Sequence, residues 1–305
     1  YRYFATPQRS FILADCPGHV QYTRNTVTGA STADAVVLLV DARHGVVEQT
    51  RRHLAVAALL KVPHVVVAVN KIDLVDFSAE VYARTAEQIE RVAAALGVAD
   101  AHVLPTSALA GDNVVERSGR TPFYNGPALL ELLESLPADS TQADRALRLP
   151  VQLVIRPQSA AAEGLTDYRG YAGRISAGAV ELGDDVVVLP SGRRTTVTGI
   201  NLGARPVLAA RAGQSVSLEL ADDIDIARGD LIAAGHDLPP LVREIEAHVA
   251  WLSERPLHAR DRVLVKHGAR TVRALVASIE GVLELDDLAI SPADELALND
   301  IGRLR

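Results

Sequence analysis

Two short motifs place chemically capable residues directly after apolar segments of strand length. The first motif is Asp15-Cys16-Pro17-Gly18-His19, which follows residues 10–14 (SFILA), a segment that predicts a buried strand of a parallel sheet. Open α/β sheets bind ligands at the carboxyl ends of their strands. An aspartate there can hold Mg²⁺ directly or through a water, because Mg²⁺ prefers oxygen ligands and keeps several waters. A bare Asp-x-x-Gly fits an ordinary strand–turn–helix junction, but the five-residue string is much more specific.

The glycine and the histidine of this motif predict a phosphate site. Gly18 lets the backbone approach a phosphate closely and offers its N–H. His19 is expected to open a helix that faces the same site, where its side chain can position or polarise an attacking water. We interpret Cys16 as a small residue in a tight turn and not as a redox sensor, because the sequence identifies no base that would activate its thiol.

The second motif is Asn70-Lys71-Ile72-Asp73, after the apolar run 64–69 (HVVVAV). The Asp73 carboxylate can accept hydrogen bonds from N1–H and N2–H₂ of guanine, whereas adenine would leave it unpaired, a mismatch rejected by roughly 10⁴ or more. Asn70 can tie neighbouring loops together, and the aliphatic stem of Lys71 can lie over the base. A lone motif of this kind is explained equally well by a turn, since Asn and Asp both favour turns.

A third loop, Thr106-Ser107-Ala108-Leu109, follows the next predicted strand. Its backbone N–H groups could meet O6 of guanine, although Ser-Ala-Leu alone carries little information. The order of the three loops, each at the end of a successive strand, indicates a guanine-nucleotide site.

The elements that must position these loops alternate between strands and helices. Residues 35–40 and 64–69 are continuous apolar runs, which are typical of a parallel sheet covered on both faces. The spacing of apolar residues predicts helices between and after them. The predicted helices are 48–60, 79–96 and 127–136, and a further strand is 102–105. Ser78 is the expected N-cap of the second helix, and Gly97 is expected to end it. This alternation predicts a doubly wound α/β domain over residues 1–137.

The pattern changes after a polar linker at residues 137–148. Short alternating segments punctuated by glycine over 149–239 predict an antiparallel β-barrel domain. A second β segment, 243–305, predicts another barrel domain that is incomplete at its end.

Composition limits the function classes. The chain has 305 residues, a net charge of −7 and one cysteine, so it suits two or three domains and has no internal disulfide. The charge argues against nucleic acid as a partner. No apolar run approaches the roughly 18–20 residues of a membrane span, and no signal peptide is visible. We therefore expect a cytoplasmic protein without a membrane partner. The absence of methionine indicates that Tyr1 is not the natural start and that the sequence is a fragment.

In their order, the three loops resemble those of the translational GTPases. The resemblance implies GTP and Mg²⁺ as cofactors, a P-loop-type GTPase fold and His19 as the catalytic residue, with Asp15 at the metal, most simply through a water. The GTP-binding residues that it implies are Asp15, Cys16, Pro17, Gly18, His19, Asn70, Lys71, Asp73, Ser107, Ala108 and Leu109.

Further strings narrow the resemblance, among them YRYF at residues 1–4, DARHGV at 41–46 and DYRGYAG at 167–173. With these strings the chain is similar, over essentially its whole length, to the large GTP-hydrolysing subunits of sulfate adenylyltransferase. That family implies a small catalytic subunit as partner, which makes adenylyl sulfate from ATP and sulfate while GTP hydrolysis drives the step. In some relatives an adenylyl-sulfate kinase domain follows at the C-terminus.

The chain also departs from the family. The phosphate loop GxxxxGK[ST] is absent, because residues 1–14 contain no glycine, and the switch threonine should also lie before Tyr1. Most charge-assisted donors to the β- and γ-phosphates are therefore missing, and we expect the chain as given to hydrolyse GTP weakly or not at all. Two alternatives stay open: an elongation factor that delivers aminoacyl-tRNA, which shares the GTPase motifs but not the narrower strings, and a non-catalytic scaffold.

Overall fold

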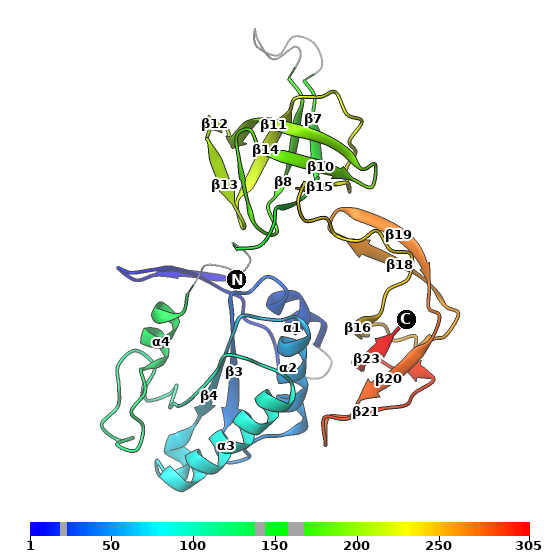
Figure 1. The fold of residues 1–305 in the computed structure, drawn as a ribbon. Helices are drawn as coiled ribbons and strands as arrows, with labels where there is room; N and C mark the ends of the chain where they lie inside the picture. The colour runs from blue at the N-terminus through cyan, green and yellow to red at the C-terminus, as the bar shows by residue number, and fades with distance from the viewer. Residues whose placement is uncertain (19–22, 138–143, 158–167) are drawn as a thin grey trace. The chain divides into compact units, whose positions relative to one another are not determined.

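The computed structural model describes residues 1–18, 23–137, 144–157 and 168–305 (Figure 1). The chain forms two compact units. The first unit comprises Tyr1–Ala138, Glu246–Asp261 and Val276–Arg305, and the second comprises Asp139–Ile245 and Arg262–Leu275. The segment 243–305 is thus shared between the two units, and the division into three domains stays a prediction.

A parallel sheet forms the centre of the first unit. Its strands are β3 (Ala35–Asp41), β4 (His64–Asn70) and β5 (Ala101–Pro105), paired in that order. The middle strand β4 is buried at every residue except Asn70, at its carboxyl end. The two apolar runs thus form neighbouring parallel strands, as predicted.

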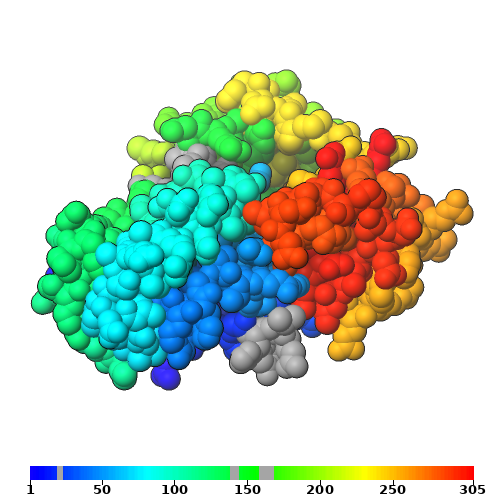
Figure 2. All heavy atoms as spheres, turned by 90° about the horizontal axis from the view of Figure 1, so that it is seen from below, coloured from blue at the N-terminus to red at the C-terminus, as the bar shows by residue number. Residues whose placement is uncertain are grey.

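Helices cover both faces of this sheet. On one face, α2 (Glu48–Leu59) and α3 (Ala79–Ala95) pack through Leu54 and Ile89, and α1 (Thr23–Ala30) joins them through Ala30. On the other face, α4 (Leu129–Ser135) packs through Leu132. Figure 2 shows α3 (cyan) on the exposed surface of the first unit. The doubly wound α/β fold is confirmed. Among the described residues, none of the helices has the length and apolar character that a membrane span requires.

Residues 10–14 differ from the prediction of a buried parallel strand, which is wrong. The strand β2 (Ser10–Leu13) pairs antiparallel with β1 (Arg2–Ala5), and Ile12 is 70% exposed. Among the described residues β2 has no strand partner other than β1, so one edge stays open. Apolar composition predicts burial only where another element covers the strand. In this hairpin the Phe4 and Phe11 rings stack on each other with their centroids 4.8 Å apart.

The second unit is built on an antiparallel sheet, which confirms the β architecture predicted there. The strand order is β6-β15-β10-β11-β14-β8-β7, with β12 beside β11, and β9 pairs with β13 separately. Its core contains the fully buried side chains of Tyr171, Leu218 and Ile232. The strands are β6 (Arg148–Pro150), β7 (Leu153–Ile155), β8 (Gly170–Arg174), β9 (Ala179–Glu181), β10 (Asp185–Leu189), β11 (Arg193–Leu202), β12 (Arg205–Pro206), β13 (Ala209–Arg211), β14 (Ser215–Leu220) and β15 (Leu231–Ala234).

Gly173 in the DYRGYAG string has a packing reason. A Cβ at this position would lie 2.2 Å from the carbonyl oxygen of Pro150, so only glycine lets β8 approach the neighbouring backbone.

The C-terminal part of the first unit is also antiparallel. Its larger sheet has the order β16-β23-β20-β21, and β17 pairs with β22. The hairpin of β18 (Arg262–His267) and β19 (Arg270–Leu275) belongs to the second unit. The strands of the first unit are β16 (Ala247–Ala250), β17 (Leu257–His258), β20 (Ile279–Leu283), β21 (Ile290–Ser291), β22 (Glu295–Leu296) and β23 (Ile301–Leu304).

Candidate nucleotide site

The loop that follows β4 is anchored by a buried residue in the middle of the motif. Ile72 is fully buried, and its N–H donates to the carbonyl oxygen of Thr106 at 3.2 Å. Lys71 has a φ of 60° and is exposed, and Asp73 lies half-buried in the short 3₁₀ helix Ile72–Val75. The side chain of Asp73 makes no hydrogen bond or ion pair among the described residues, so its carboxylate is available to a ligand.

Asn70 joins this loop to the one after β5. Its Oδ1 accepts a hydrogen bond from the backbone N–H of Ala108 at 2.9 Å and a longer one from Oγ1 of Thr106 at 3.5 Å. The N–H of Thr106 in turn donates to Val69 O at 2.8 Å. The two loops, residues 70–73 and 106–109, are here called the base loops.

The second base loop turns on a buried serine. Ser107 is fully buried, and its Oγ accepts a hydrogen bond from Ala110 N at 3.3 Å. Since the N–H of Ala108 already donates to Asn70, the N–H of Leu109 is the one in this turn that makes no hydrogen bond among the described residues. The Leu109 side chain is 95% exposed. A ligand acceptor could therefore meet the loop at Leu109 N.

A polar network behind this loop was missed by the sequence analysis. Asp112 is 7% exposed and accepts hydrogen bonds from Nε (3.0 Å) and Nη2 (2.5 Å) of Arg120 and from Oγ of Ser118 (2.6 Å). Asn113 is buried with a φ of 54°, and its Nδ2 donates to the carbonyl oxygen of Pro105 and to Oγ1 of Thr121, both at 2.9 Å. The signal in the sequence was Gly111-Asp112-Asn113, directly after the serine loop, but its partners lie five to eight residues away.

Asp41, at the end of β3, was also missed. It accepts hydrogen bonds from Nε (2.9 Å) and Nη2 (2.6 Å) of Arg43 and from Nζ of Lys71 (2.9 Å). These bonds, chiefly those of Arg43, hold the pKa of Asp41 well below its usual range although partial burial opposes them. Asp41 is therefore ionised and links the end of β3 to the first base loop.

The loop after β2, residues 15–18, is held by few contacts. The Cys16 thiol donates to the carbonyl oxygen of Asn25 at 3.4 Å, and a Cβ added at Gly29 would lie 2.6 Å from its sulfur. This close fit agrees with a small residue in a turn. Asp15 and Pro17 are exposed, and Asp15 has no hydrogen-bond or ion-pair partner among the described residues. Its place past a parallel strand, as predicted, is wrong, because β2 belongs to a hairpin.

Gly18 and the end of β3 line one cavity of about 290 Å³. His53 of α2 also lines it: its Cε1 lies 3.8 Å from the position that a Cβ of Gly18 would take, and its Nε2 contacts Nε2 of Gln49 at 2.8 Å. Burial lowers the pKa of His53, with a smaller contribution from the charge of Arg52. The structure thus connects both base loops directly and brings Gly18 to the strand end beside them. His19 lies outside the described residues.

The oxygen donors of the site are few for a magnesium ion. Asp15 supplies one exposed carboxylate without a protein partner, and Mg²⁺ is usually bound by one or two carboxylates together with waters and substrate phosphates. The site therefore fits an ion that a nucleotide brings with it, and not an ion held by protein alone. Among the described residues no group of three or more His, Cys, Asp or Glu side chains is arranged to hold a metal.

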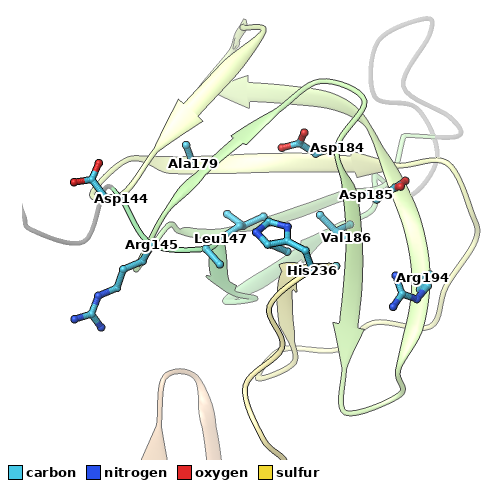
Figure 3. Close-up of a pocket in the computed structure, with 12 residues that line it drawn as sticks. Asp144, Arg145, Leu147, Ala179, Asp184, Asp185, Val186, Arg194 and His236 are labelled. Atoms are coloured by element: carbon cyan, nitrogen blue, oxygen red, sulfur yellow. The ribbon is translucent and has the colours of Figure 1, made fainter.

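A larger cavity of about 600 Å³ lies in the second unit, and none of the described motif residues lines it (Figure 3). His236, Leu147 and Val186 line its middle, and the Arg145 side chain extends away from His236. The Asp184 carboxylate on its wall already accepts a hydrogen bond from the backbone N–H of Glu181 at 2.8 Å. Its charged side chains do not converge on one point, so the base loops, and not this cavity, form the candidate site.

The chain is similar to known proteins in both sequence and structure. Residues 1–141 match the family model of the elongation factor Tu GTP binding domain. The whole chain is 47% identical to a bifunctional enzyme CysN/CysC of Mycobacterium tuberculosis, covering 49% of that protein, and 44% identical to sulfate adenylyltransferase subunit 1 of Laribacter hongkongensis, covering 62%. A crystal structure of Sup35 complexed with GMPPNP is similar at 26% identity and a TM-score of 0.45, over 100% of this chain and 75% of that one. The chain thus spans about half to three fifths of the length of these curated relatives.

Proposed function

Since the chain belongs to the family of sulfate adenylyltransferase subunit 1, with a GTP-binding domain of the elongation factor Tu type, we propose that it is part of the GTP-hydrolysing subunit of a sulfate adenylyltransferase. The observation that carries the proposal is identity of 44–47% along the entire chain, not only along the GTP-binding domain. In the proposed reaction ATP and sulfate give adenylyl sulfate and pyrophosphate, and GTP hydrolysis drives this step.

The base loops would select guanine. Asp73 would accept hydrogen bonds from N1–H and N2–H₂ of the base, which its unpartnered carboxylate supports. Lys71 would lie against the face of the base, and the turn Ser107-Ala108-Leu109 would donate a backbone N–H to O6. Because Asn70 joins the two loops, the groups on either side of the base are already held together before the nucleotide binds.

Residues 15–18 and His19 would serve the phosphates. Bound Mg²⁺ would neutralise phosphate charge, with Asp15 holding the ion most simply through a water. The backbone N–H of Gly18 would donate to the γ-phosphate, and His19 would orient the attacking water. Cys16 and Pro17 would shape the turn between them.

The partner is proposed to be the small catalytic subunit, on which ATP and sulfate react. The name subunit 1 of the relatives supports a heteromeric assembly, and the bifunctional relatives favour a whole protein that also carries an adenylyl-sulfate kinase domain. We propose no membrane and no nucleic-acid partner, and a cytoplasmic site of action.

The test uses the whole protein together with its small subunit. Adenylyl sulfate formation from ATP and sulfate is measured with GTP, without GTP and with a non-hydrolysable GTP analogue. We expect GTP to raise product formation and the analogue to fail to sustain it, and His19→Ala to behave like the analogue. Product formation that is indifferent to GTP would overturn the proposal.

Two further outcomes belong to the alternatives. Tight, GTP-dependent retention of aminoacyl-tRNA on a filter would identify an elongation factor instead. Failure of the whole protein to bind any guanine nucleotide would favour a non-catalytic scaffold.

A further inference from the structure

Asp41 lies directly beside the first base loop although it belongs to another strand. In the parallel sheet, Asp41 of β3 is the register partner of Asn70 of β4. The next N–H along the chain, that of Ala42, donates to Asn70 O at 2.9 Å. This backbone pairing places the Asp41 carboxylate opposite the residue that follows Asn70, which is Lys71, and their charged groups meet at 2.9 Å.

Arg43 fixes the carboxylate in place. Oδ1 of Asp41 accepts hydrogen bonds from the backbone N–H (3.0 Å) and Nε (2.9 Å) of Arg43, while Oδ2 accepts from Nη2 of Arg43 (2.6 Å) and Nζ of Lys71. A planar guanidinium bound in this bidentate way sets orientation as well as distance. Asp41 is therefore a rigid anchor, and the flexible member of the ion pair is Lys71.

These contacts exclude other roles for Asp41. Both of its oxygens are engaged by cations, so it is a poor ligand for a metal ion. As the acceptor of several charge-assisted hydrogen bonds, it is also a poor proton acceptor in a reaction. What remains free to act is the stem of Lys71, whose side chain is 49% exposed.

We infer that Asp41 is a positioning residue for base recognition: it holds the Lys71 ammonium so that the aliphatic stem already lies along the place of the guanine face. The inference rests on the proposed function of the base loops. A free lysine stem samples many rotamers, and ordering it on binding would weaken affinity. The ion pair with Asp41 orders the stem beforehand, whether or not a nucleotide is bound.

The experiment is a double-mutant cycle on nucleotide affinity in the whole protein. Asp41→Asn, Lys71→Met and the double variant are titrated with a fluorescent GDP. Asp41→Asn should weaken binding about threefold to fivefold, the range of a partly exposed ion pair. Because Asp41 acts through Lys71, the double variant should bind no more weakly than Lys71→Met alone. Asp41→Glu should recover most of the loss.

A second readout separates positioning from disturbance of the loop. IDP lacks the 2-amino group of GDP, so the ratio of GDP to IDP affinity reports on Asp73. A stem that lies against the face of the base serves both nucleotides, and the ratio should stay unchanged in Asp41→Asn. Glu48→Gln is the matched control, because Glu48 forms an ion pair with Arg52 at 2.7 Å at the start of α2 and should leave both affinities unchanged.

The outcomes separate this inference from the proposed function. Additive losses in the double variant, or a collapsed GDP-to-IDP ratio in Asp41→Asn, overturn the positioning role while leaving guanine binding in place. A wild-type protein that binds neither GDP nor IDP overturns the proposed function itself.

Discussion

The base loops and the 15–18 loop follow strands of different kinds. The base loops follow β4 and β5, which are paired in a parallel sheet and covered by helices on both faces. The 15–18 loop follows β2, an open strand of a two-stranded hairpin. Asn70 and Ile72 tie the base loops together by hydrogen bonds. Among the described residues, the side chains of the 15–18 loop make one hydrogen bond, from the Cys16 thiol.

This difference separates selection of the base from handling of the phosphates. A rigid pocket discriminates strongly between bases, because a mismatched base leaves buried or fixed polar groups unpaired. Phosphate groups carry their own charge and metal ion, so they can order a loosely held loop as they bind. We therefore expect substitutions at the base loops to change which nucleotide binds. Substitutions around residues 15–18 should have smaller effects on that selection.

The largest expected effect is a change of base preference in Asp73→Asn. The amide keeps one acceptor but offers an N–H₂ where guanine also donates, so GTP affinity should fall about 100- to 1000-fold. Xanthine carries an oxygen at position 2 and accepts that hydrogen bond, so XTP should bind better than GTP. Competition of GTP and XTP against a fluorescent nucleotide measures the exchange.

Asp76→Asn is the control for this variant. Asp76 is exposed at a φ of 53°, a conformation that asparagine tolerates, and it should leave the preference unchanged. An Asp73→Asn protein that still prefers GTP would remove Asp73 from the site.

The second prediction tests the polar network around Asn113 behind the base loops, here called the brace. Asn113→Ala removes hydrogen bonds to Pro105 O and Thr121 Oγ1 and one accepted from Ser118 N, and it leaves a non-glycine residue at a φ of 54°. Urea unfolding should show a free energy of unfolding lower by about 2–4 kcal/mol, because several buried polar groups lose their partners.

Asn201→Ala in the second unit is a useful comparison. Among the described residues Asn201 makes one side-chain hydrogen bond, to Glu219 at 2.9 Å, so the loss there should be about 1 kcal/mol and GDP affinity should not change. Equal losses at the two positions would mean that the brace has no special part in holding the base loops.

The third prediction concerns the packing of the 15–18 loop on α1. Gly29→Ala places a Cβ 2.6 Å from the Cys16 sulfur, so the loop must shift, and stability should fall by about 1–2 kcal/mol. Adding Cys16→Ala removes the sulfur and should recover most of that loss, as thermal unfolding of the two variants would show. If the double variant is no more stable than Gly29→Ala, the contact between Cys16 and α1 is not what limits the size of the side chain at position 29.

Much of the region that holds the base loops, the parallel sheet and its helices, could be predicted from local sequence. The run HVVVAV predicts a strand buried on both faces, and Ser78 and Gly97 predict the ends of α3. In the structure Ser78 Oγ accepts from Val81 N at 3.3 Å, and Gly97 has a φ of 73°. The order of the last two motif loops also predicts that the ends of β4 and β5 lie together.

The rest depends on partners that are distant in sequence. Asp41 and Lys71 are thirty residues apart, and their contact follows from the register of β3 and β4, which no local pattern gives. The apolar residues of β2 resemble a buried strand because burial is decided by what covers the strand and not by its own composition. The roles of the base-loop residues in GTP binding remain predictions, as does that of His19.

The smallest expected effect is at β2, where the comparison is most direct. Ile12→Lys changes a side chain that is 70% exposed, so the free energy of unfolding should change by less than about 0.5 kcal/mol. Val67→Ala, at a fully buried position of β4, should lower it by about 1–3 kcal/mol, because it leaves a cavity between α2, α3 and the sheet. Both variants are measured in the whole protein by chemical unfolding. A loss at Ile12 as large as that at Val67 would show that β2 is covered in the whole protein, and the contrast between the open and the buried strand would then have to be abandoned.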